Sequence, residues 1–205
     1  SLVDYIPATG SEEGRYRLHD LARIFAESCL AQGELTDIQQ SHARHYSKVL
    51  SQANNLYKKG GKFILDGLKL FDSELANITV GHAWVKSAIQ SYRRFNKNDL
   101  KSIMQLASSY AGAGVYIMDL RLHPRDEITW LETGLAASKI MGDRQAEGVH
   151  LGNLGLAYGH LGEPRKAIEH HEQALAIIRE IGDKRAEGEI LGNLGLSYSD
   201  LGEPR

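Results

Sequence analysis

Hydrophobic residues in the C-terminal third of the chain recur every three or four positions, as they do along one face of a helix. A first stripe comprises Leu151, Leu154, Tyr158 and Leu161, and a second comprises Ala167, His171, Ala174, Ile178 and Ile181. Between the stripes, Gly162 suits the end of one helix and Pro164 suits the first turn of the next. The pattern predicts a helical hairpin whose two stripes pack together.

This hairpin is one unit of a 40-residue repeat. Three of the four prolines lie 40 residues apart, and each is followed by arginine: Pro124, Pro164 and Pro204. A shift of 40 places residues 142–165 over residues 182–205 with 17 of 24 positions identical. One hairpin cannot bury both of its stripes, so we expect neighbouring units to stack.

Capping residues and a divergent upstream unit complete the repeat pattern. Gly142 and Gly182 suit the left-handed position that ends a helix, and Asp143 and Asp183 are good N-caps for the next one. Upstream, Trp130 and Gly134 align with His170 and Ala174, but the first helix of that unit lacks the Leu-Gly and Tyr signals. We therefore predict a degenerate unit over 99–141, a full unit over 142–181 and a half unit over 182–205.

The repeat resembles the tetratricopeptide repeat, in a form of about 40 residues with an extended second helix. The matching residues are Leu154, Gly155 and Tyr158 in the first helix, and Ala167, His171 and Ala174 in the second. His171 departs from the aromatic residue usual at its position. The resemblance implies an all-α fold of stacked helical hairpins and a groove that binds a protein or peptide.

Residues 1–34 differ from the repeats in their pattern of hydrophobic and polar residues, and they are predicted to be the C-terminal part of a winged helix. Leu2–Ile6 and Arg15–Leu18 suit a β-hairpin, and Asp20 suits the start of a helix. The triplet Leu18-His19-Asp20 resembles the one that ends the nucleotide-binding apparatus of NB-ARC proteins, in the STAND class of signalling ATPases. That resemblance implies that His19 contacts the phosphate of a bound ADP. The alternative is that His19 only caps a helix start.

Residues 35–98 are predicted to form a helical linker domain of four helices. The segments His42–Tyr46 and Leu70–Ile78, followed by Trp84, resemble signatures of bacterial STAND regulators in the same order. The resemblance implies a cytoplasmic sensor arm that controls a switch between ADP-bound and ATP-bound states. The Mg-dependent nucleotide site would then lie elsewhere in a longer parent protein. A constitutive scaffold without a nucleotide switch is the alternative.

The face opposite the packing stripe of each first helix is the candidate binding surface. We expect it to become the wall of a groove when the units stack. Its candidate partner-binding residues are Val149, Asn153, Leu156, His160, Glu189, Asn193, Leu196 and Asp200. Asparagine amides can donate to and accept from a peptide backbone. The two units differ on this face, for example at Val149 and Glu189. The alternative is that these asparagines hydrogen-bond to a neighbouring helix and that the sequence differences on this face have no functional role.

Composition and short motifs argue against several other classes of function. The net charge of −2 offers no support for a nucleic-acid partner. The single cysteine, Cys29, suits a reducing compartment and no apolar stretch is long enough to span a membrane. The nearest phosphate-loop string, Lys59–Phe63, lacks the required glycine and hydroxyl, so no catalysis and no cofactor are expected within the chain. The histidine pair His42 and His45 lacks a further ligand, so no metal site is expected.

The last half unit has a packing stripe of its own. Because no second helix follows it in the chain, we expect the stripe to lack intramolecular cover and to support self-association. Its residues are Leu191, Leu194, Tyr198 and Leu201.

Overall fold

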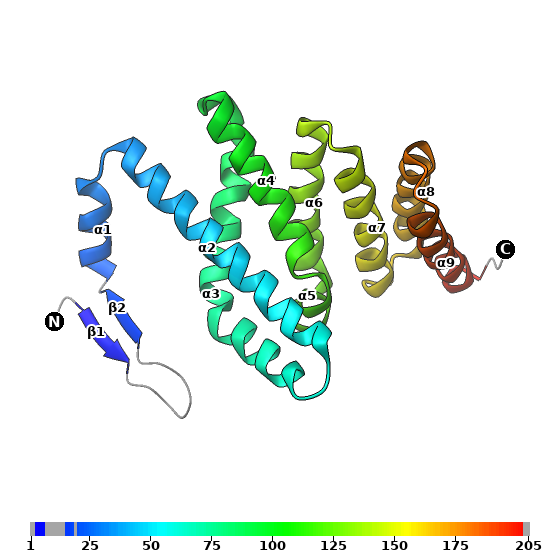
Figure 1. Cartoon of the computed structure of the whole chain (residues 1–205), viewed down its shortest axis with the longest axis horizontal. Helices are drawn as coiled ribbons and strands as arrows, with labels where there is room; N and C mark the ends of the chain where they lie inside the picture. The colour runs from blue at the N-terminus through cyan, green and yellow to red at the C-terminus, as the bar shows by residue number, and fades with distance from the viewer. Residues whose placement is uncertain (1–2, 7–14, 19, 203–205) are drawn as a thin grey trace. The chain divides into compact units, whose positions relative to one another are not determined.

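A computed structural model describes residues 3–6, 15–18 and 20–202 of the chain (Figure 1). The chain divides into two compact units, residues 1–41 and 42–205. In the first unit, β1 (Val3–Ile6) pairs antiparallel with β2 (Arg15–Leu18), and α1 (Asp20–Cys29) follows. Two strands and a helix do not by themselves identify a winged helix, so that assignment stays a prediction.

Two long helices occupy the region for which we predicted four. They are α2 (Gln32–Lys59) and α3 (Phe63–Gln90), of 28 residues each. The prediction of four helices is wrong because, between Gln32 and Gln90, the only break is at Gly60 and Gly61, whose φ angles are 73° and 57°. Gly67 stays helical, and a Cβ there would lie 2.6 Å from the carbonyl oxygen of Ala53. This glycine permits a close approach of α2 and α3 instead of ending a helix.

The main core of the second unit is shared by helices α2 to α6. After the short 3-10 helix η1 (Tyr92–Arg94) come α4 (Lys97–Ala113), α5 (Val115–Arg121) and α6 (Pro124–Met141). Phe71, Tyr110 and Trp130 belong to one buried cluster. The Tyr110 hydroxyl donates to the carbonyl oxygen of Ala43 at 2.8 Å, and the His82 ring stacks on Trp130 with centroids 4.2 Å apart. The proposed boundaries at residues 34/35 and 98/99 stay predictions.

The C-terminal helices form the predicted stack of hairpins. These are α7 (Arg144–His160), α8 (Pro164–Ile181) and α9 (Lys184–Asp200). Figure 1 shows α6, α7, α8 and α9 packed in chain order, and each contacts the next. The all-helical repeat architecture predicted from the 40-residue period is confirmed for this part of the chain.

The helix ends of the repeats are those expected from the sequence. Gly142 and Gly182 are left-handed, with φ angles of 68° and 82°. The side chains of Asp143 and Asp183 each accept a hydrogen bond from the backbone N–H three residues later, at 3.0 Å. These interactions satisfy donors that the first helical turn leaves without partners.

Six of the nine residues in the packing stripes of the full repeat are buried, and Tyr158 and Leu161 are half-buried. Leu151, Leu154, Ala167, His171, Ala174 and Ile178 are buried. Ile181 is 40% exposed, so its inclusion in the stripe is wrong. It is the last residue of α8, and the chain turns away at Gly182.

Candidate functional site

The predicted groove residues of α7 lie on the side of the helix away from its buried leucines. Val149 is 43% exposed, Asn153 and Leu156 are half-buried, and His160 is exposed. The buried stripe of α7 faces its neighbours, so these four side chains remain accessible. Their place on an accessible face agrees with the prediction, and their role in binding a partner stays a prediction.

A hollow of about 110 Å³ opens beside this part of α7. Three elements line it: α5, the first turn of α6, and the C-terminal half of α7. The lining residues are Val115, Tyr116, Asp119, Glu127, Asn153, Leu156 and His160. Three of the predicted groove residues are thus brought together, with four residues that the sequence analysis did not single out. Val149 does not line this hollow.

A histidine and a carboxylate form a pair at the rim of the hollow. His160 Nδ1 lies 2.7 Å from Asp119 Oδ1, and both side chains are about half-exposed, at 50% and 47%. The interaction joins α5 to the last turn of α7. It gives the imidazole an acceptor partner in the neutral form and a counter-ion when the imidazole is protonated.

Glu127 is the most unusual residue of the hollow. It is only 4% exposed, and among the described residues its carboxylate makes no hydrogen bond or salt bridge. Burial raises the pKa of Glu127 to about 7, with a further contribution from the negative charge of Asp119. A buried carboxyl group without a partner is costly to ionise, so the hollow favours any group that would compensate its charge.

One signal in the sequence could have identified Glu127. It lies 40 residues before Ala167, a fully buried position of the packing stripe. A charged residue in place of a small apolar one breaks the repeat pattern. The prediction of a degenerate unit rests on the missing Leu-Gly and Tyr signals, and it does not use this charged position.

The four candidate residues of α9 lie on the corresponding face of the next unit. Glu189, Leu196 and Asp200 are exposed, and Asn193 is half-buried. Glu189 pairs with Arg185 of the same helix at 3.1 Å, where solvent screens the interaction. These residues do not line the hollow beside α7, so the eight predicted residues do not form one pocket.

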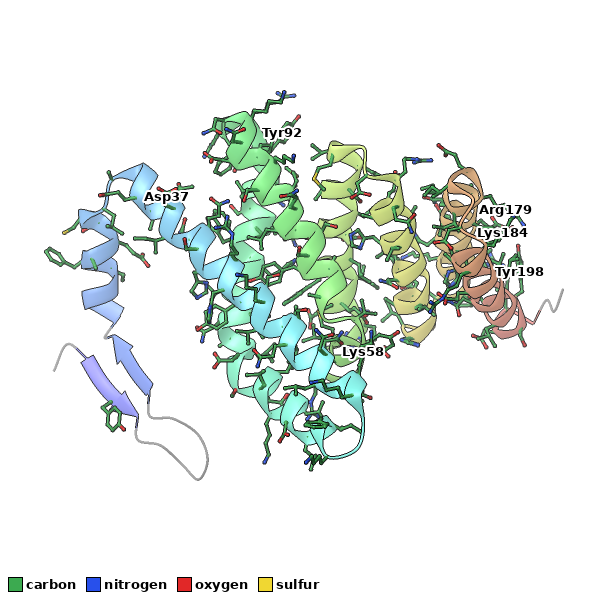
Figure 2. All side chains as sticks on the ribbon, in the orientation of Figure 1. Asp37, Lys58, Tyr92, Arg179, Lys184 and Tyr198 are labelled. Carbon is green, nitrogen blue, oxygen red and sulfur yellow. The ribbon has the colours of Figure 1, made fainter. Side chains whose placement is uncertain are left out.

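The stripe of α9 is only partly exposed, which corrects the expectation that all four of its residues lack cover. Leu191 is 43% exposed, as predicted, and Leu194 and Leu201 are half-buried. Tyr198, labelled in Figure 2, is only 7% exposed. Its hydroxyl donates to Glu172 Oε1 at 2.9 Å. The reason is that α9 packs on α8, which covers one edge of the stripe.

The remaining candidate residues from the sequence are His19, His42 and His45. His19 lies outside the described residues. The His42 and His45 rings both pack against Tyr46, with centroids 4.6 Å and 4.9 Å away. In residues 3–6, 15–18 and 20–202, no group of three or more His, Cys, Asp or Glu side chains is placed to hold a metal ion. Across the same residues, no helix has the length and apolar character that a membrane span requires.

Comparison with known families identifies the repeats. Residues 146–205 match the tetratricopeptide repeat family. The match covers α7, α8 and α9 and begins after the degenerate unit. No curated protein sequence matches the chain. The C-terminal helices are therefore tetratricopeptide repeats, a type of unit that commonly mediates contacts between proteins.

Proposed function

We propose that the chain is a non-catalytic protein-interaction module that binds a partner peptide along the exposed face of α7 and α9. The observation that carries this proposal is the hollow beside Asn153, which places a half-buried amide between apolar and charged side chains. Within the described residues, the side-chain amides of Asn153 and Asn193 make no hydrogen bond. This supports a ligand-binding role over a bond to a neighbouring helix, because both amides remain free to pair with a peptide backbone.

Binding of the chain to an array of unrelated peptides tests this proposal. We expect a subset of peptides to bind, and we expect the double variant Asn153→Ala, Asn193→Ala to bind them about tenfold more weakly, the effect of losing about 1.4 kcal/mol. Its melting temperature should change little, since neither side chain is part of the core. Gln173→Ala, on the exposed side of α8, is the matched control and should bind normally. Equal binding by the double variant would contradict the proposal.

More specifically, we propose that this module is the sensor arm of a bacterial signalling ATPase of the NB-ARC type. The order of the Leu18-His19-Asp20 triplet, the two linker signatures and the repeats supports this form. Binding of a partner to the arm would shift the parent protein between its ADP-bound state and its ATP-bound, assembled state. His19 would contact the ADP phosphate, and the Mg ion and the remaining nucleotide contacts would come from the parent protein.

The parent reading frame distinguishes this switch from a constitutive scaffold. A phosphate-binding loop upstream of residue 1 supports the switch. In that case His19→Ala in the full-length protein should release ADP faster. A reading frame without such a loop supports the scaffold.

Two further expectations belong to the same proposal. The module is expected to act in the cytoplasm, without a nucleic-acid partner. Self-association is expected through the exposed part of the α9 stripe at Leu191. Sedimentation of the chain and of Leu191→Glu tests this last expectation, and a wild-type monomer at high concentration would contradict it.

A further inference from the structure

The hollow beside α7 contains a buried carboxyl group, that of Glu127, to which no described residue gives a hydrogen bond or a counter-ion. The Glu127 side chain is almost fully buried, with only 4% of the residue exposed. No described residue donates a hydrogen bond to its carboxylate. An ionised carboxylate in such a position normally has a cationic or hydrogen-bonding partner. Glu127 lines the hollow, so a group that enters the hollow can reach the carboxylate.

A second carboxylate reinforces the first. Asp119 lines the same hollow and lies close enough to Glu127 for its charge to disfavour ionisation of that residue. His160 already pairs with Asp119 at 2.7 Å, at the rim. A cation placed between the two carboxylates would relieve their repulsion and would supply the counter-ion that Glu127 lacks. A bound anion would increase the repulsion.

The walls of the hollow suit the carbon chain that carries such a cation. Val115, Tyr116 and Leu156 provide apolar surface next to the carboxylates. The Tyr116 ring already attracts an ammonium group, because Lys58 Nζ lies 5.1 Å from its centroid. Lys58, labelled in Figure 2, is not among the residues that line the hollow. A volume of about 110 Å³ exceeds the space for one water several times, so the end of a long side chain fits.

We propose that this hollow binds the cationic side chain of a lysine or arginine in the partner peptide, with Glu127 and Asp119 as counter-ions. The methylene groups pack on Tyr116 and Leu156, and the amide of Asn153 is available to the peptide backbone. This inference rests on the proposed function, since it names the chemistry of the partner that the groove accepts. It makes the module selective for basic peptides, although its own net charge is only −2.

Nuclear magnetic resonance titration of the ¹⁵N-labelled chain with single capped amino acids tests the inference directly. The probes are N-acetyl-lysine methylamide and N-acetyl-arginine methylamide, with the norleucine and citrulline analogues as uncharged controls of similar shape. At pH 8, where Glu127 is mostly ionised, we expect the cationic probes to shift amides of α5, the start of α6 and the end of α7. Millimolar dissociation constants are expected for ligands of this size. The two cationic probes establish whether lysine or arginine is preferred.

Charge-neutral variants identify the residues responsible. Glu127→Gln keeps the size of the side chain and should weaken binding of the cationic probes about tenfold, and Asp119→Asn should weaken it less. Glu169→Gln removes an exposed carboxylate of α8 outside the hollow and should leave binding unchanged. This matched control separates a local effect from the change in net charge.

The possible results separate this inference from the proposed function. Equal shifts with norleucine and lysine, unchanged binding by Glu127→Gln, or no shift with either cation would overturn the inference. The proposed function would survive that result if arrayed peptides still bind through Asn153 and Asn193. If the cationic probes bind the hollow but no peptide binds the groove, the inference about the hollow stands and the peptide-binding function fails.

Discussion

Gly155 of α7 lies directly against the ring of His171 of α8. A Cβ atom added to Gly155 would be 2.5 Å from His171 Nδ1, far closer than such atoms approach in folded proteins. His171 is itself 1% exposed. The pair therefore sets how closely the two helices of the repeat approach, and it explains why a glycine is kept inside a helix.

Alanine at the two equivalent glycines should have opposite effects. Gly155→Ala should lower the free energy of unfolding by about 1–3 kcal/mol, because the His171 ring has to move within a packed interior. At Gly195, 40 residues later, an added Cβ meets nothing within 4 Å among the described residues. Gly195→Ala should stabilise the chain by about 0.5–1 kcal/mol through helix propensity. Urea denaturation of both variants checks this, and equal effects would mean that the helices do not approach as described.

The equivalent leucines of α7 and α9 should also differ. Leu151 is 1% exposed and packs against α8, whereas Leu191 is 43% exposed. Leu151→Ala should cost about 2–5 kcal/mol through lost contacts and a cavity. In dilute solution, where the chain is not self-associated, Leu191→Ala should cost less than about 1 kcal/mol, because its side chain is already partly in water. Thermal and urea unfolding measure both. A loss at Leu191 as large as that at Leu151 would indicate that another chain covers α9.

Replacing Glu127 with glutamine should stabilise the chain, and more strongly at high pH. The pKa of Glu127 is raised from 4.5 to about 7, so ionisation in the folded state is unfavourable. The unfolded state loses this proton first, so the wild type becomes less stable as pH rises from about 4.5 through 7. Glu127→Gln lacks this loss and should exceed the wild type by about 1–3 kcal/mol at pH 8. Denaturation of the wild type and of Glu127→Gln at pH 5 and pH 8 measures the difference in their free energies of unfolding. The same difference at both pH values would contradict the prediction.

Acid should destabilise the second unit through its buried histidines. Burial lowers the pKa of His82, His150 and His171 from 6.5 to about 4. Between pH 6.5 and 4 the unfolded state binds more protons than the folded state, so stability falls as pH falls. Each histidine should contribute about 1–3 kcal/mol over this range.

The variant His171→Phe identifies one of these contributions. It keeps an aromatic ring against Gly155 and removes the titrating nitrogen atoms. We expect a shallower decline of the melting temperature between pH 7 and pH 5 than in the wild type. An unchanged pH dependence would show that His171 is not responsible.

The sequence alone determined the repeat and its helix boundaries. Asp143, Gly142 and Pro164 act within a few residues of their own positions, because capping and turn formation depend on local backbone geometry. The burial of Leu151 and Leu154 follows from their periodic spacing along one helix. A 40-residue period of this kind is typical of stacked hairpins, so local signals were sufficient for the repeat architecture.

Only the tertiary structure decided where charge is buried and which faces are covered. The alignment of Glu127 with buried Ala167 hints at its burial, but the contacts that bury it depend on how α5 and α7 meet the first turn of α6, which the sequence does not show. Tyr198 is buried because α8 lies beside α9, although its stripe was expected to lack cover. Gly67 and Gly81 lie within one long helix because packing against α2 and Tyr110 favours glycine there. Each of these outcomes depends on contacts between residues distant in sequence, and those contacts form only when the helices assemble.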